Sequence, residues 1–312
     1  AMLQLPGWGR RFFARAARQR VFTPTVFEGA TKIEPPQPVP GHIPRPSWAA
    51  RPGGHPERLP DSLFAEVKSP EAIEKVRRAN QVAARALQAA LAAAQPGATT
   101  HDVDRAAFDV TVAAGAYPTG IGFHGFPKGI CTSVNEVVVH GIPDSRVLQD
   151  GDICNIDVSV YLDGHYGDNS AMALVGTVDE EGKRLCEVTR RSMEAAISAV
   201  GPGVPLSKVG EVIHGIADAE GYAVIREFCG HFIGRELHMS PIVKHYRNDD
   251  DVILRPGMTF TIEPILCEGS NHCYQWADGW TIVTRDHGRT AQWEHTVLIT
   301  DDGREILSKV ED

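Results

Sequence analysis

The chain has 312 residues, of which 42% are hydrophobic and 23% charged, and its net charge is −9. These proportions are typical of a globular domain with a large buried core, and the negative charge excludes a generally basic nucleic-acid-binding protein. No apolar run approaches the ~18 residues of a membrane-spanning helix, and no two cysteines form a CxxC pair, so we expect neither a membrane span nor a zinc finger.

Residues 1–34 form a basic N-terminal segment. Its first 27 residues contain five arginines and no Asp or Glu, whereas the rest of the chain is acidic. An Arg-rich segment without acids is typical of an organellar transit peptide, and the alternative is a disordered basic tail or a cloning remnant. We therefore predict an organellar protein, from a mitochondrion or a plastid, and a cytoplasmic one if this segment is not a targeting signal.

Residues 35–68 form a proline-rich strap. Nine of the 21 prolines of the chain lie between residues 35 and 60. Because proline lacks a backbone N–H and has a fixed φ, this stretch cannot form a sheet ladder. We expect it to lie extended, either as a linker or across the surface of the domain that follows.

Residues 69–312 show alternating helix and strand patterns. Ser69 is a capping residue and Pro70 suits the first helical position, so a helix is expected to begin here and to end at Pro96. A second helix is expected over residues 100–114. Strand patterns follow at 134–140 and 153–161, then helices at 184–200 and 206–220, and then strands near 258–265, 279–284 and 291–299.

An offset of 106 residues superimposes the second half of this region on the first. Helix-ending and apolar positions then coincide: Pro96-Gly97 with Pro202-Gly203, Val103 with Val209, Gly115 with Gly221, Leu148 with Leu254, Gly151 with Gly257 and Ile156 with Ile262. The next residue is an acid in both copies, Asp157 or Glu263. The matches predict an α+β fold of two halves related by a pseudo-two-fold axis, with a curved, mostly antiparallel sheet, outer helices and the two acids facing each other at the seam.

Strand parity places carboxylates on the inner face of that sheet. Ile156 and Val158 point to one face of their strand, so Asp157 points to the other. The chain then turns and returns through Asp168, which brings a second acid beside the first on an adjacent strand. A buried carboxylate without a partner costs several kcal/mol, so the two acids need a compensating charge.

The second half adds Glu263, Glu294 and His231 to this set. Four carboxylates and one neutral imidazole carry a charge of about −4, which two divalent ions would cancel. Oxygen ligands with one nitrogen favour Mn, Fe, Co or Mg over a structural zinc, and two neighbouring metal ions form a hydrolytic centre. Each residue alone also has an ordinary interpretation as a strand-end, turn or hydrogen-bonded residue, as do His140 and His238, so the prediction depends on their conjunction.

These residues lie in motifs that resemble the type I methionine aminopeptidases, which have the pita-bread (creatinase/aminopeptidase) fold. The resemblance covers residues from about 69 to 307 and implies that residues 69–312 are a catalytic metallopeptidase domain. The strap is similar to the extensions of organellar and some bacterial members. The motifs are Val139-His-Gly-Ile-Pro143, Asn155-Ile-Asp-Val158, Gly167-Asp168, Gly230-His231, Thr261-Ile-Glu-Pro264 and Ala291-Gln-Trp-Glu-His-Thr296, with Gly125-Phe-Pro-Lys128 and Asp278-Gly-Trp-Thr281.

The resemblance implies a role for each of these residues. It implies two divalent ions per chain (Co, Mn, Fe or Zn), with Asp168 and Glu294 bridging them, and Glu263 as an acid/base group as well as a ligand. His140 and His238 would contact the peptide and its developing oxyanion. The implied metal ligands are Asp157, Asp168, His231, Glu263 and Glu294, and the implied pocket for a methionine side chain is Phe123, Phe126, Cys131, Leu237 and Trp280.

The implied activity is metal-dependent removal of the initiator methionine from nascent polypeptides when the second residue is small. The enzyme would act as a monomer, with the ribosome exit region as a further partner and no nucleic acid. One alternative is a non-catalytic pita-bread binding protein, but such proteins typically lose ligands and all five are present here. Another is a proline-directed peptidase of the same fold, which usually carries a larger N-terminal domain.

Four departures from the family pattern concern the shape of the pocket and the rate, among them Met239-Ser240 after His238 and Asn169 where threonine is usual. The other two are at Phe232 and at His165-Tyr166. Phe232 replaces a glycine that usually follows the ligand histidine, and a phenylalanine there is expected to strain the backbone or narrow the site if φ is positive. His165 and Tyr166 stand in swapped order. None of the four removes a ligand.

Overall fold

The computed structural model describes residues 31–57, 60 and 64–309. The basic segment, predicted over residues 1–34, therefore lies almost wholly outside the described residues. Within them, no helix combines the length and the apolar character that crossing a membrane requires. From residue 70 onward, helices and strands alternate in the predicted order.

The described residues contain four α-helices, and local capping marks an end of each. In α1 (Pro70–Ala93) the Ser69 side chain accepts a hydrogen bond from the backbone N–H of Ala72, as the sequence predicts. In α2 (Thr100–Ala113) a capping box closes the first turn. Then α3 (Glu180–Ala199) begins four residues before the predicted start, because Asp179 caps it, and α4 (Lys208–Glu220) ends at a glycine with a φ of 75°.

The strands form one large sheet and two small ones, and every pairing among the described strands is antiparallel. The large sheet has the order β1 (Tyr117–Pro118), β4 (Ile153–Leu162), β5 (His165–Leu174), β14 (Glu294–Ile299), β9 (Thr259–Ile262), β7 (Gly230–Phe232) and β8 (Met239–Val243). Two more strands flank this order, β2 (Cys131–Val134) on β4 and β15 (Arg304–Ile306) on β14. The small sheets are β13 (Thr290–Gln292), β10 (Ile265–Cys267) and β6 (Ala223–Val224), and β11 (Cys273–Gln275), β12 (Ile282–Thr284) and β3 (Val137–Val139).

Three predicted strands are each divided in two, which the alternation of side chains did not reveal. The strand expected over 134–140 is interrupted by a turn at Asn135, whose φ is 54°. The strand expected over 258–265 is interrupted at Pro264, which has no N–H for a ladder. The strand expected over 291–299 is divided at Trp293 into β13 and β14, which belong to different sheets.

The predicted internal repeat is present in the backbone. An isolated bridge pairs Thr99 with Val147, and its counterpart 106 residues later pairs Pro205 with Ile253. The hydrogen bond from the N–H of Gly97 to Leu148 likewise recurs from Gly203 to Leu254, at 2.9 Å in both copies. The α+β prediction of two related halves with a continuous antiparallel sheet is therefore confirmed.

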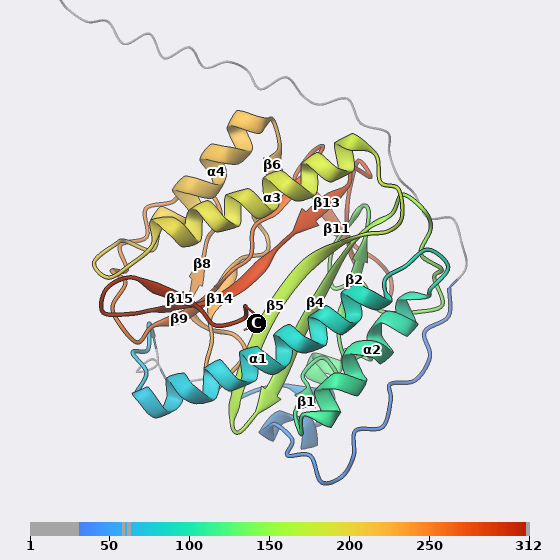
Figure 1. Cartoon of the computed structure of the whole chain (residues 1–312), viewed down its shortest axis with the longest axis horizontal. Helices are drawn as coiled ribbons and strands as arrows, with labels where there is room; N and C mark the ends of the chain where they lie inside the picture. The colour runs from blue at the N-terminus through green and yellow to red at the C-terminus, as the bar shows by residue number, and fades with distance from the viewer. Residues whose placement is uncertain (1–30, 58–59, 61–63, 310–312) are drawn as a thin grey trace, which may run out of the picture.

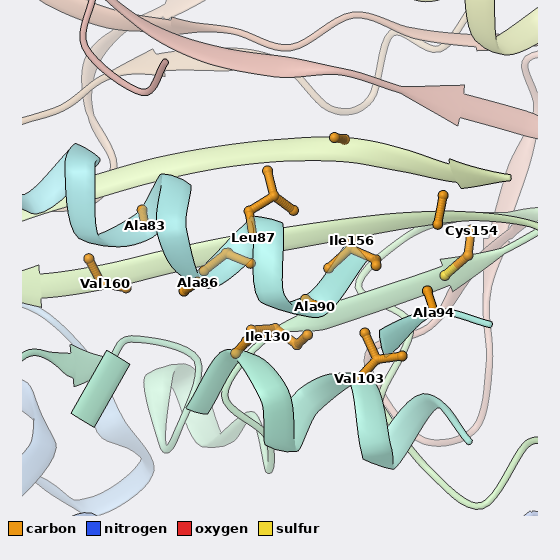
Figure 2. Packing of buried hydrophobic residues seen from close by; sticks show 14 of the residues in the cluster. Ala83, Ala86, Leu87, Ala90, Ala94, Val103, Ile130, Cys154, Ile156 and Val160 are labelled. Carbon is orange, nitrogen blue, oxygen red and sulfur yellow. The ribbon is translucent and has the colours of Figure 1, made fainter. Parts of the chain in front are cut away.

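The helices pack on the outer face of the sheet, α1 and α2 over the first half and α3 and α4 over the second (Figure 1). Small side chains allow α1 to lie close to the sheet: Ala86 and Ala90 of α1 are buried together with Ile156 and Val160 of β4 (Figure 2). Burial of these apolar faces stabilises the fold by about 25 cal/mol per Å². The opposite face of β4, which carries Asp157, is left for the site.

The strap runs over the first half, close to α2 and β1 (Figure 1). Apart from two short 3₁₀ turns, η1 (Ser47–Ala50) and η2 (Pro52–Gly54), its described residues up to 57 have no regular structure. Val39, Ile43 and Trp48 are nevertheless buried, in a cluster with Phe108 and Tyr117 of the domain. The strap is therefore packed on the domain through these three side chains.

Candidate active site

One cavity of about 820 Å³ brings together all the residues that the sequence singled out. It lies on the inner side of the large sheet, where the two halves meet. Each sequence-predicted residue lines it: Asp157, Asp168, His231, Glu263, Glu294, His140, His238, Phe123, Phe126, Cys131, Leu237 and Trp280.

The hairpin β4–β5 positions two of the carboxylates. Ser159 lies opposite Asp168 in the ladder, and its hydroxyl donates a hydrogen bond to Oδ1 of Asp168 at 2.9 Å. The backbone N–H of Asp168 donates to Oδ1 of Asn80 at 3.2 Å, and its carbonyl accepts from the hydroxyl of Thr296 at 2.8 Å. Asp168 is therefore fixed by both its backbone and its side chain.

Asn80 is a residue of the site that sequence reasoning missed. It lies in α1 and is fully buried, and its amide donates to the carbonyl of Val76. A polar residue within an otherwise apolar helix stripe is the signal that could have identified it, because a buried amide requires partners.

His231 lies on β7 and faces the acids of both halves. Its backbone N–H donates to the hydroxyl of Thr261 at 3.0 Å. Its Nδ1 is 3.2 Å from the carbonyl oxygen of Phe232, and Nε2 is 3.6 Å from a carboxylate oxygen of both Asp168 and Glu263. When Nδ1–H donates to that carbonyl, the lone pair of Nε2 points toward the carboxylates, which is the arrangement of a metal-ligating histidine.

Glu263 follows the last residue of β9 and is held by three hydrogen bonds. The hydroxyl of Thr261 donates to Oε1 at 2.7 Å, and the amide of Gln292 donates to Oε2 at 3.2 Å. The backbone N–H donates to Nε2 of His245 at 3.1 Å, a second residue that sequence reasoning missed. Glu294, the first residue of β14, is buried beside them.

The electric charge of this cluster is not balanced by the side chains around it. Burial raises the pKa of Asp157 and of Glu294, and the negative charges of the neighbouring acids raise it further. Burial raises the pKa of Glu263 to about 7. Burial alone would lower the pKa of His231, but the neighbouring carboxylates of Asp168 and Glu263 outweigh that effect and raise it.

The donor set fits divalent metal ions. Ligand atoms of Asp168, His231 and Glu294 all lie within 4.8 Å of one another. Oε1 of Gln292, which is directed into the same region, is buried without a hydrogen-bond partner. An oxygen-rich donor set with one imidazole, in which the carboxylates repel one another, is compatible with divalent metal ions.

His140 and His238 lie on the wall of the cavity beside the carboxylates. Burial lowers the pKa of His140 to about 4. Loss of hydration among the surrounding residues lowers the pKa of His238, which lines the cavity, and the imidazoles of His231 and His140 lower it further. Both rings are therefore neutral at pH 7, so each can donate one hydrogen bond without carrying a charge.

Aromatic and aliphatic side chains form an apolar wall next to these histidines. The rings of Phe126 and Trp280 meet edge to face with centroids 5.0 Å apart, and those of Phe123 and His238 are 5.6 Å apart. Cys131 pairs with Asp157 in the sheet register, and burial raises the pKa of its thiol, which is therefore neutral. Such a wall suits an unbranched apolar side chain.

The expected strain or narrowing at Phe232 does not occur. Phe232 is a strand residue of β7, and it is not among the described residues that have a positive φ. Its ring is fully buried in the hydrophobic core of the second half, where it stacks on Phe260 with centroids 5.4 Å apart. It does not line the cavity. The side chain points to the outer face because the parity of β7 directs His231 to the inner one.

Comparison with known proteins supports this description. Residues 74–301 match metallopeptidase family M24. The chain is 47% identical over 284 residues to methionine aminopeptidase 1D, chloroplastic/mitochondrial, of Arabidopsis thaliana, a match that covers 89% of this chain and 78% of the relative. Among solved structures, a methionine aminopeptidase from Thermotoga maritima matches with a TM-score of 0.77 and 40% identity, over 78% of this chain and 99% of that one. A prolidase from Pyrococcus horikoshii, with a TM-score of 0.64 at 23% identity, shares the fold alone.

Proposed function

Because the chain belongs to metallopeptidase family M24, we propose that its cavity is the active site of a methionine aminopeptidase, which hydrolyses the bond after an N-terminal methionine. Identities of 47% to the Arabidopsis enzyme and 40% to the Thermotoga one support this assignment. The observation that carries it is that one cavity is lined by four carboxylates, by a histidine oriented as a metal ligand and by an apolar wall. The pita-bread fold predicted from the sequence is confirmed by the same comparisons.

We propose that two divalent ions are held by Asp157, Asp168, His231, Glu263 and Glu294, with Asp168 and Glu294 shared between them. Asp168 and Glu294 suit that role because both lie where the halves meet: Glu294 of β14 is opposite Ser170 of β5, and the hydroxyl of Thr296 in β14 donates to the carbonyl of Asp168. Bound ions would supply a Lewis acid for the scissile carbonyl and an ionised water at neutral pH.

The protein groups around the ions would position the peptide and move its protons. The carboxylate of Glu263, held in place by Thr261 and Gln292, can accept a proton from the attacking water and return it to the leaving amine. Neutral His140 and His238 can donate hydrogen bonds to the carbonyl oxygen as negative charge develops on it. The apolar wall would hold the methionine side chain, and we propose that only a small second residue fits beside it.

The natural substrates on this proposal are nascent polypeptides that begin with methionine. Action at the ribosome exit region and a monomeric state remain predictions from the sequence resemblance.

Cleavage of two tripeptides tests the activity directly. With metal-stripped protein titrated with Mn²⁺ or Co²⁺, we expect methionine release from Met-Ala-Ser and no release from Met-Lys-Ser. Glu263→Ala is the inactive control, with loss of about 10³-fold or more in kcat. Trp280→Ala should raise KM for Met-Ala-Ser, because it removes part of the apolar wall. Tight metal binding without cleavage of either peptide would favour the non-catalytic alternative.

We further propose that the protein acts in an organelle. The Arg-rich composition of residues 1–34 and the chloroplastic/mitochondrial relative support this localisation. Residues 1–40 fused to a fluorescent reporter are expected to direct it to mitochondria or plastids, and the same fusion with the five arginines changed to Gln should not. A diffuse cytosolic signal from the unchanged fusion would contradict the localisation.

A further inference from the structure

The strap touches the rim of the cavity through three of its residues, Trp48, Gly54 and His55. The ring of Trp48 meets that of Phe123 edge to face, with centroids 5.2 Å apart. Nδ1 of His55 lies 2.8 Å from Nδ1 of His124. A Cβ on Gly54 would lie only 1.6 Å from the carbonyl oxygen of Gly122, so the two backbones are in direct contact there.

That rim needs support from outside because its own backbone is unfavourable. The short turn η4 (Phe123–Gly125) follows Gly122, whose φ is 83°, and contains His124 with a φ of 48°. A residue with a side chain costs about 1 kcal/mol or more in this left-handed region. Its hydrogen bonds are local to the turn, as from Gly125 N–H to Gly122 and from Gly122 N–H to Phe126. Tertiary contacts must therefore help to hold Phe123 in place.

Trp48 contacts this rim and also makes a buried hydrogen bond behind it. It is fully buried, and its indole N–H donates a hydrogen bond to the hydroxyl of Tyr166 at 2.8 Å. Tyr166 in turn belongs to a hydrophobic cluster with Leu237 and Phe123, which both line the cavity. One side chain of the strap thus supports two residues of the apolar wall, Phe123 by direct contact and Leu237 through Tyr166.

We propose that Trp48 is a positioning residue that sets the width of the methionine pocket, so that the strap is an outer wall of the active site and not only a surface attachment. The inference rests on the proposed function, since it assigns the apolar wall to a methionine side chain. Trp48 itself does not line the cavity. It acts through Phe123 and through Tyr166. Tyr166 and its neighbour His165 occur in the reverse of the order that is usual in the family.

Selectivity between methionine and ethionine measures the width of the pocket, because ethionine is longer by one methylene. Without Trp48, Phe123 can move into the vacated space, and the pocket becomes larger. We expect Trp48→Ala to reduce the preference for Met-Ala-Ser over ethionyl-Ala-Ser, in kcat/KM, by about tenfold, which is the order of discrimination that one methylene provides. Trp48→Phe retains a ring against Phe123 and is expected to keep most of the preference.

Ile43→Ala is the matched control. Ile43 is buried in the same strap and the same cluster as Trp48, but it neither donates to Tyr166 nor lines the cavity. Both alanine variants should lower Tm, because each leaves a cavity in the cluster. Only Trp48→Ala should change the ratio of kcat/KM for Met-Ala-Ser to kcat/KM for ethionyl-Ala-Ser. Equal changes of the ratio in both variants, or a lower Tm with an unchanged ratio in Trp48→Ala, would overturn the inference.

Binding of free L-methionine and L-ethionine, measured by calorimetry, separates this inference from the proposed activity. If the wild type cleaves neither peptide but binds methionine more tightly than ethionine, the proposed activity is wrong. The inference about Trp48 is then judged from whether Trp48→Ala reduces the difference in affinity between the two amino acids. If the wild type binds neither amino acid and cleaves neither peptide, the assignment of the pocket is wrong and the inference falls with it.

Discussion

Asp168→Asn is expected to reduce kcat for Met-Ala-Ser by about 10³-fold or more. The substitution keeps the shape of the side chain but removes the negative charge at the centre of the cluster, where Asp168 lies 3.6 Å from Nε2 of His231. If Asp168 bridges two ions, a neutral amide there cannot hold both, and the loss of one electrophile costs several kcal/mol of transition-state stabilisation. We expect metal analysis of the variant to show at least one ion fewer per chain than the wild type.

Asp163→Asn, on the same β4–β5 hairpin, is the control for that variant. Asp163 lies in the exposed turn, where it pairs with Arg78 at 2.9 Å. An exposed pair of this kind contributes less than about 1 kcal/mol, and asparagine tolerates its φ of 50°. Turnover and metal content should therefore match the wild type. If Asp168→Asn retained two ions and full turnover, the bridging role would be wrong.

The second large effect is a dependence of stability on pH in the metal-free protein. We expect its Tm to be highest near pH 6 to 6.5 and to fall on both sides. On the alkaline side, the folded-state pKa of Glu263 is about 7, well above its ordinary 4.5, and those of Asp157 and Glu294 are also raised. Since the folded state then binds more protons than the unfolded one, stability is full at low pH and is lost as pH rises through the folded-state values.

On the acidic side the histidines have the opposite effect. Burial lowers the pKa of His140 to about 4, of His245 to about 3 and of His295 to about 4. These groups must be neutral in the folded state but protonate freely in the unfolded one, so stability is lost as pH falls below about 6.5. Bound metal ions should remove most of the loss of stability at alkaline pH, because they compensate the charge of the carboxylates. They should leave the loss of stability at acidic pH, which comes from the histidines.

Glu263→Gln isolates the carboxylate contribution. At pH 8 the metal-free variant should be more stable than the metal-free wild type by an amount on the order of 3 kcal/mol, which corresponds to roughly 5 to 10 °C in Tm. At pH 5 the two should be nearly equal, since Glu263 is then protonated. Glu181→Gln, at an exposed position of α3, should follow the wild type at both values. A wild type whose metal-free Tm rose steadily from pH 6 to 8 would contradict the charge repulsion in this cluster.

The helices and the acids of the site were predictable because local chemistry determines them. Ser69 and Pro70 start α1 as predicted, and the alternation of Ile156, Asp157 and Val158 correctly placed the acid on the inner face. The 106-residue offset predicted that Glu263 would join Asp157 at one cavity. Each of these predictions uses neighbours in sequence or a repeated pattern, which tertiary contacts did not override.

Other features depend on contacts between distant segments and could not be predicted in this way. The division of the last long strand at Trp293 occurs because β13 and β14 join different sheets, and no local signal marks that choice. The role of Asn80 depends on Asp168, 88 residues away. The burial of Trp48 likewise depends on Tyr117 and Phe123, which the composition of a proline-rich strap does not indicate. Phe232 was wrongly expected to affect the site because the direction of its side chain was not known.

The internal repeat makes the chain comparable to a dimer whose two subunits have been fused. A symmetric dimer presents every residue of its interface twice, so a site on its axis can hold only identical pairs of ligands. Covalent fusion removes that restriction: Asp157 and Glu263 still occupy equivalent places, whereas Asp168 belongs to the first half alone and His231 and Glu294 to the second. This freedom to diverge gives the two sides of the cavity different side chains. On the proposed function, histidine ligation and acid/base work both fall on one side, an asymmetry that suits a directional reaction on a peptide.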